Sequence, residues 1–246
     1  MNRSTLWPVF AVLVLCSCGS GCRRPAERAA EKAVAELLPT YLGPAAKYGV
    51  KVEADSLGAL VRGRVRGVRI EGTEVRIVPD LTVGELRIDA EEVEVRRDRK
   101  SLRSVGKARF RCRIDGLEIA RAVRTRSSPE EAPDVRVVGS VMHVRVVPRL
   151  MGVPTLPVDV EGRLEVSAGG STMHFVPDSA RLSIVPVPKA VLGFVSERVN
   201  PVVDLRKANV PVVVETALLR DGALHLRGTI PPEEIVRRSE GITTSE

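Results

Sequence analysis

Strict alternation of apolar and charged residues is the sequence feature that most constrains the fold of this chain. Residues 109–114 read RFRCRI and residues 92–96 read EVEVR. A period of two sends successive side chains to opposite faces of a β-strand. Each such strand therefore has one apolar and one charged face, as in antiparallel sheets that are solvated on one side.

Further strands are predicted at 135–147, 157–167, 172–176, 180–185, 210–217 and 223–230. The dipeptide Asp221-Gly222 between the last two is a strong hairpin signal. Aliphatic residues at helical spacing predict a helix over 30–41 that Pro39 ends or kinks. A short helix is expected at 117–123 and another within 187–205. The fold class is thus α+β and mainly β, with long antiparallel strands.

Composition excludes several classes of protein. Hydrophobic residues make up 43% of the 246 residues and charged residues 28%, which excludes a disordered chain. Aromatic residues reach only 3%, so the core must consist of Val, Leu, Ile and Ala. Because single-stranded nucleic acids bind largely by stacking on aromatic rings, we expect no nucleic-acid partner despite the net charge of +7.

Residues 1–17 have the pattern of a secretory leader. Arg3 supplies the positive start, and the apolar stretch Leu6–Leu15 is too short to span a bilayer. The sequence Leu15-Cys16-Ser17-Cys18 then resembles a bacterial lipobox, in which a cysteine becomes the new N-terminus and carries diacylglycerol. We therefore expect lipid attachment and a location in the bacterial cell envelope, on the periplasmic or extracytoplasmic face.

Cys18 fits the attachment site best because the residue before it, Ser17, is small. Cys16 would follow a bulky leucine, and Cys22 lacks a leucine three positions earlier. An ordinary cleaved signal with incidental cysteines is the alternative. Cys112 is expected to be a small buried residue, and a disulfide between Cys22 and Cys112 stays open.

The chain divides into four expected parts. Residues 1–17 form the signal peptide, and 18–49 form a linker and an amphipathic helix. Residues 50–232 form a single elongated domain, with two similar halves as the alternative. Residues 233–246, rich in charge, are expected to be a flexible tail.

Catalytic and metal-binding patterns are missing from the sequence. His143, His174 and His225 lie in strand-like segments at spacings unlike those of metal sites. Neither a nucleophile elbow nor a phosphate-binding glycine loop is present. We therefore expect no catalytic residues, no metal, no cofactor and no enzymatic activity.

Arginines recur on the charged strand faces. Within 96–113 the only acid is Asp98, and arginine forks suit the phosphates of anionic lipids. A solvated face that keeps the sheet soluble is the equally weighted alternative. The head-group candidates are Arg62, Arg64, Arg66, Arg109, Arg111 and Arg113.

Several segments together resemble the LmeA-like family of bacterial phospholipid-binding proteins. They are LVRGRVRGVRIEG (60–72), VGELRIDAEEVEV (83–95), IDGLEIARAV (114–123) and the closing segment 200–230 with Asn200-Pro201 and Asp221-Gly222. The resemblance implies a curled, TULIP-like sheet wrapped around one or two helices. It also implies phospholipid as a partner and supplies no catalytic residue.

On that basis we expect phospholipid acyl chains to occupy an apolar groove, for lipid binding or shuttling in the envelope. The helix near 189–199 would line the groove with Val191, Leu192, Val195 and Val199. The alternative is a structural or interaction lipoprotein with a filled core and a basic docking face. No protein partner is indicated.

Replacing Cys18 by alanine tests the anchor. Because the diacylglycerol would have no thiol to join, the variant should leave the membrane pellet for the soluble fraction. Fractionation of cells followed by immunoblotting measures this shift. Retention of the variant in the membrane would instead point to Cys16 or Cys22.

Overall fold

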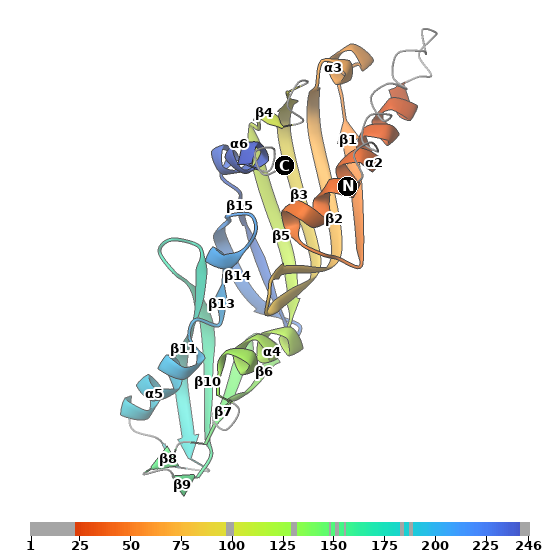
Figure 1. Cartoon of the computed structure of the whole chain (residues 1–246). Helices are drawn as coiled ribbons and strands as arrows, with labels where there is room; N and C mark the ends of the chain where they lie inside the picture. The colour runs from red at the N-terminus through yellow and green to blue at the C-terminus, as the bar shows by residue number, and fades with distance from the viewer. Residues whose placement is uncertain are drawn as a thin grey trace, which may run out of the picture.

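The computed structural model describes residues 23–96, 101–128, 132–147, 149–150, 153–154, 156–182, 185–186 and 189–241. They form an elongated body in which two antiparallel sheets follow one another along the long axis (Figure 1). With 50% strand and 29% helix, the chain is mainly β as predicted. Residues 1–22, including Cys16, Cys18 and Cys22, lie outside the described residues.

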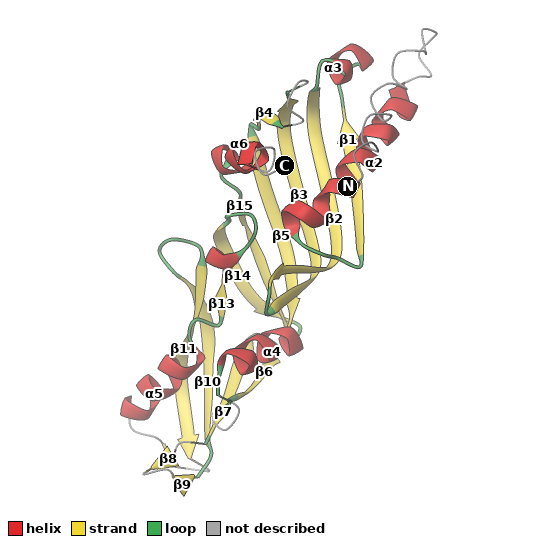
Figure 2. Cartoon of the chain, viewed as in Figure 1, coloured by secondary structure: helices red, strands yellow, loops and turns green. Residues whose placement is uncertain are grey.

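The first sheet has the strand order β1-β2-β3-β5-β15-β14, with β4 paired to β3. Figure 2 shows its long strands curling into a half-barrel. The strands are β1 (Lys47–Glu53), β2 (Arg64–Val78), β3 (Leu81–Val95), β4 (Leu102–Ser104), β5 (Lys107–Asp115), β14 (Val213–Arg220) and β15 (Ala223–Thr229).

The second sheet has the order β12-β11-β10-β7-β6, with β13 paired to β11, and a small β8-β9 pair lies beside it. Its strands come from the middle of the chain, so the first sheet is completed only by the returning C-terminal strands. They are β6 (Asp134–Val138), β7 (Val141–Val146), β8 (Arg149–Leu150), β9 (Val153–Pro154), β10 (Val158–Val166), β11 (Thr172–Leu182), β12 (Val185–Pro186) and β13 (Val203–Asp204).

Helices pack against both sheets. Helix α2 crosses β1 and β2, α4 packs on β6 and the ends of β3 and β5, and α5 packs on β11 (Figure 1). The curled sheet with helices against it agrees with the predicted fold class. The helices are α2 (Arg23–Leu42), α3 (Leu57–Val61), α4 (Gly116–Arg126), α5 (Lys189–Val199) and α6 (Pro232–Gly241).

Helix α2 protects the edge of the first sheet. The backbone N–H of Val52 on β1 donates to Glu31 Oε1 at 3.1 Å, and that of Ala54, just after β1, donates to Glu27 Oε1 at 3.4 Å. Edge strands otherwise present unpaired donors to other chains. The carboxylates of α2 therefore take the place of a further strand.

Helix α2 runs past Pro39 to Leu42, so Pro39 does not end it, and the Pro39 carbonyl accepts a hydrogen bond from Gly43 N at 3.1 Å. Two strand expectations were wrong in detail. The segment 135–147 is a hairpin, β6–β7, and not one strand, because Gly139 adopts a φ of 59° and turns the chain. The strand expected at 180–185 continues β11 up to Leu182.

The expected flexible tail begins with an ordered helix. Residues Pro232–Gly241 form α6, which packs against β4. Ser239 is buried on this helix, and its Oγ accepts a hydrogen bond from Leu102 N at 3.0 Å. The amphipathic pattern that buries Ile235 and Val236 against the core outweighs the high charge of the segment.

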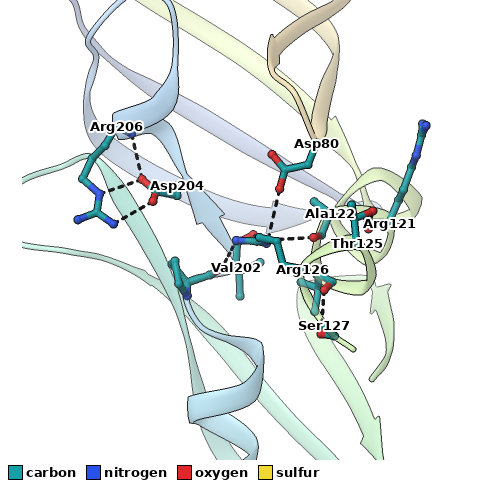
Figure 3. A network of polar contacts seen from close by, with 11 residues as sticks. Asp80, Arg121, Ala122, Thr125, Arg126, Ser127, Val202, Asp204 and Arg206 are labelled. Carbon is teal, nitrogen blue, oxygen red and sulfur yellow. Dashed lines mark hydrogen bonds and ion pairs between the residues drawn. The ribbon is translucent and has the colours of Figure 1, made fainter. Parts of the chain in front are cut away.

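One arginine fastens the two sheets together (Figure 3). Arg126 of α4 donates to the carbonyl oxygens of Pro201 and Val202, both at 2.5 Å, next to β13 of the second sheet. Its Nε lies 3.4 Å from Asp80 Oδ2, in the turn between β2 and β3 of the first sheet. Burial lowers the pKa of Arg126, and Asp80 and Asp204 oppose that effect.

Replacing Arg126 by methionine tests this fastening. The change leaves two backbone carbonyl oxygens and the Asp80 carboxylate without their partner, so we expect the free energy of unfolding to fall by about 2–4 kcal/mol. Urea denaturation followed by circular dichroism measures the loss. The matched variant Arg124→Met, on the exposed side of the same helix, should change stability by about 0.5 kcal/mol or less. Equal midpoints for both variants would contradict the role of Arg126.

Candidate functional site

The first sheet has two chemically opposite faces, because its strands alternate as the sequence predicted. On β5, Phe110 and Cys112 are buried at 5% and 8% exposure, whereas Arg109 and Arg111 are exposed. The register carries this division across the sheet, since Phe110 faces Ile88 of β3 and Cys112 faces Leu86. We call the apolar side the inner face and the arginine-bearing side the outer face.

An apolar recess of about 50 Å³ lies on the inner face. Strands β2, β3 and β5 form its floor, and the segment 205–212 covers it. Among the described residues, none with a charged side chain lines it, and Asn209 is the one polar residue of this lining. The lining consists of Leu42, Ile77, Val83, Leu86, Ile88, Phe110, Cys112, Leu205, Ala208, Asn209, Val210, Val212 and Ile230.

The apolar surface continues beyond the recess toward α2. Val68 and Ile70 of β2 are half-buried, as is Ala90 of β3. Val68 faces Ala90 in the register, and Ile70 faces Ile88 of the recess floor. The inner face therefore offers an apolar strip longer than the recess itself.

The cover over the recess combines apolar packing, with Leu205 buried at 3% exposure, with polar contacts. Asp204 Oδ1 accepts hydrogen bonds from Arg206 N at 3.1 Å and Arg206 Nε at 2.9 Å, at the start of the 3₁₀ turn Leu205–Lys207. The bond from Arg206, opposed by partial burial, holds the pKa of Asp204 below its usual value. Arg238 of α6 donates to the Asn209 carbonyl.

A glycine lets one aromatic ring lie flat on the floor. A Cβ at Gly228 would lie 2.0 Å from the Val213 carbonyl oxygen and 2.8 Å from Phe110 Cε1. Neither neighbour leaves room for a side chain, so β15 must carry glycine opposite Phe110. The phenyl ring consequently spreads over the neighbouring strand and forms part of the apolar lining.

The groove candidates of α5 lie elsewhere in the fold. Val195 and Val199 are almost fully buried, at 0% and 2% exposure, in the core beneath β11, and Leu192 packs beside them. The side chain of Val191 lies outside the described residues. None of the described three lines the recess, so their contact with lipid stays a prediction.

The arginine candidates form no single cluster around the recess. Arg62 follows α3 and is exposed, Arg64 pairs with Glu94 at 3.0 Å, and Arg66 pairs with Glu53 at 2.9 Å. Arg109, Arg111 and Arg113 lie on the outer face, with Arg113 bound to Asp115 at 2.7 Å. A head-group role for these six also stays a prediction.

The histidines make ordinary strand contacts. His143 Nδ1 lies 3.7 Å from Glu161, and His174 Nε2 lies 3.2 Å from Thr172 Oγ1. Among the described residues, no group of three or more His, Cys, Asp or Glu side chains is placed to hold a metal ion. The expectation that the chain is no enzyme is not tested by these contacts.

Sequence comparison supplies the family. The model of a family described as LmeA-like phospholipid-binding matches residues 22–229. The chain belongs to the LmeA-like family. Membership supports phospholipid binding as its function, and the lining of the apolar recess lies within the matched segment except for Ile230. No curated protein and no solved structure matches the chain.

In this LmeA-like protein, none of the helices in the described ranges has both the length and the apolar character needed to cross a bilayer. The sequence predicted the strand at 109–114, which supplies Phe110 and Cys112 to the floor of the recess. It missed the cover, because the strand expected at 210–217 begins only at Val213. Pro211 and the polar residues before it were the available signal for a non-strand segment.

Cys112 provides a chemical probe of the recess. Desolvation by burial raises the pKa of its thiol to about 12. Thiolate is the reactive form, so at pH 8 we expect maleimide to label Cys112 about a thousandfold more slowly in the folded protein than in urea. Mass spectrometry of timed samples from a chain carrying Cys16→Ser, Cys18→Ser and Cys22→Ser measures this rate.

An added Ser140→Cys gives the matched control, since Ser140 is exposed in the β6–β7 turn. This cysteine should react at the rate of an unfolded chain. Fast labelling of Cys112 in the folded protein would show that the inner face is open to water.

Proposed function

We propose that this protein is an exported lipoprotein, anchored through Cys18, that holds phospholipid acyl chains on its inner face. Its role would be to bind or shuttle lipid in the bacterial cell envelope, without enzymatic activity. The observation that carries the proposal is the uncharged recess on a curled sheet in a member of a phospholipid-binding family. Export and anchoring rest on the leader pattern of residues 1–18.

The chemistry of the lining suits an acyl chain. An acyl chain neither donates nor accepts hydrogen bonds, and the apolar floor of the recess needs none. Burying one methylene group stabilises a complex by about 0.8 kcal/mol, so a dozen carbons contribute roughly 10 kcal/mol before the costs of binding. The recess is therefore matched to aliphatic ligands rather than to polar metabolites.

Volume requires the site to open. A cavity of about 50 Å³ holds only a few water-sized groups, far fewer than the carbons of an acyl chain. To admit an acyl chain, the segment 205–212 must move outward, or the acyl chain must extend along the apolar strip of Val68, Ile70 and Ala90. The segment 205–212 lies between β13 and β14 and belongs to neither strand, so it can move outward without breaking the strand pairing of the floor.

The head group would emerge beside the cover. Asn209 is the one polar lining residue, and Arg206, Lys207 and Arg238 lie around that end of the segment. Phosphate favours such basic surroundings. The arginines of the outer face would not reach a head group here, because the sheet lies between them and the recess.

The second candidate function is an anchored scaffold with a filled interior. It is favoured by the small size of the cavity and by the tight packing of Val195 and Val199 under β11. In that case the protein would contain no extractable lipid. The two functions are therefore separated by lipid content.

Lipid content is the decisive measurement. We expect gently purified protein to release phospholipid that mass spectrometry detects after solvent extraction. Ala208→Trp should reduce the lipid-to-protein ratio at least threefold, because the indole would fill the recess. Ala46→Trp is the matched control on an exposed alanine and should retain the lipid. Wild-type protein that is empty and takes up no added phospholipid would overturn the proposal.

A further inference from the structure

The outer face of the first sheet carries an unusual row of like charges. Arg111 of β5 lies directly opposite Arg87 of β3 on one side and Arg227 of β15 on the other. Like charges directly opposite on neighbouring strands destabilise a sheet. The fold therefore tolerates three arginines at directly opposite positions on three adjacent strands.

One neighbouring row adds to the positive charge. Lys51, Arg69, Asp89 and Arg109 follow one another across β1, β2, β3 and β5, so this row holds three bases and one acid. In the row of Arg87, Arg111 and Arg227, the acid is Glu71 of β2. Both rows therefore have a surplus of arginine and lysine.

One carboxylate, that of Asp89, interacts with three of these arginines. Asp89 accepts from Arg69 Nε at 2.7 Å and from Arg87 Nε at 3.0 Å, and Arg111 Nη2 lies 3.7 Å away. Burial raises the pKa of Asp89, but the bonds from the two arginines outweigh it and keep the pKa below its usual value. In the described part of the chain, no acidic side chain forms an ion pair with Arg109 or Arg227.

The remaining outer positions suit a lipid surface. Thr229 faces Arg109, and Thr216 faces Arg227, so hydroxyl groups flank the guanidinium groups. Leu218 lies opposite His225 on the same face and is 60% exposed. An exposed aliphatic side chain beside arginines is typical of residues that enter the head-group region of a bilayer.

We propose that the outer face docks on an anionic lipid bilayer, with Arg109, Arg111 and Arg227 binding lipid phosphates. Arginine forks bind phosphate through two parallel hydrogen bonds, and the surplus charge gives the attraction. A bilayer fits better than nucleic acid, because no aromatic side chain occupies these rows for base stacking. The inference rests on the proposed function, since a phospholipid carrier must approach a membrane to exchange its ligand.

Vesicle co-sedimentation tests the docking. The full chain carrying Cys18→Ala is mixed at low salt with vesicles of phosphatidylcholine alone or with one third phosphatidylglycerol. The neutral vesicles measure any contribution of the leader. We expect binding only to the anionic vesicles, and release when salt rises to 0.5 M.

Paired variants locate the surface. The double variant Arg111→Gln/Arg227→Gln should bind anionic vesicles ten- to thirtyfold more weakly, since each arginine near a membrane contributes about fivefold. The control Arg121→Gln/Arg124→Gln removes the same charge from α4 and should change binding less than threefold. Asp89→Asn should strengthen binding by releasing the arginines it neutralises.

Three outcomes would overturn the docking surface. The first is equal binding to neutral and anionic vesicles, and the second is an equal loss of binding in both double variants. The third is retention of the protein on immobilised polyglutamate without binding to vesicles, which would assign the outer face to an acidic protein partner. Extracted lipid from the wild-type protein is measured separately. Protein that contains lipid but does not bind vesicles would refute the docking surface alone. Protein that binds vesicles but contains no lipid would refute the proposed function alone.

Discussion

The separation of side chains by the β-pleat is the constraint on which the rest of this structure depends. On β5 a single strand supplies Phe110 and Cys112 to one face and Arg109 and Arg111 to the other. Because the register holds this division across β2, β3, β5 and β15, the apolar recess and the basic rows are produced by one pattern. A slip of one residue in any pairing would exchange the two faces.

Such a sheet needs protection at its edge and at its junction with the rest of the chain. Helix α2 provides the first through Glu27 and Glu31, which bond the exposed donors of β1. Arg126 provides the second by joining the β2–β3 turn to the carbonyls before β13. Both devices use charged side chains as substitutes for missing backbone partners, which suits a chain whose aromatic content is only 3%.

Local patterns predicted the parts of the fold that alternation determines. The strands around Phe110 and the hairpin at Asp221-Gly222 were visible because their signals lie within a few residues. The turn at Gly139 was missed, since valines on both sides continue one apolar pattern through it. Helix α6 was missed because its stability comes from Ser239 and Val236 packing near β4, more than a hundred residues away in sequence. The cover of the recess depends likewise on Arg238 meeting Asn209, which no local pattern encodes.

The recess of about 50 Å³ leaves little apolar surface of the inner face in contact with water. If the proposed function holds, the protein without lipid would therefore expose no large apolar patch through which it could self-associate. Its outline would then change on loading, as the segment 205–212 swings away from the floor. A binding partner that contacts this segment would then distinguish the lipid-loaded protein from the empty one without contacting the lipid.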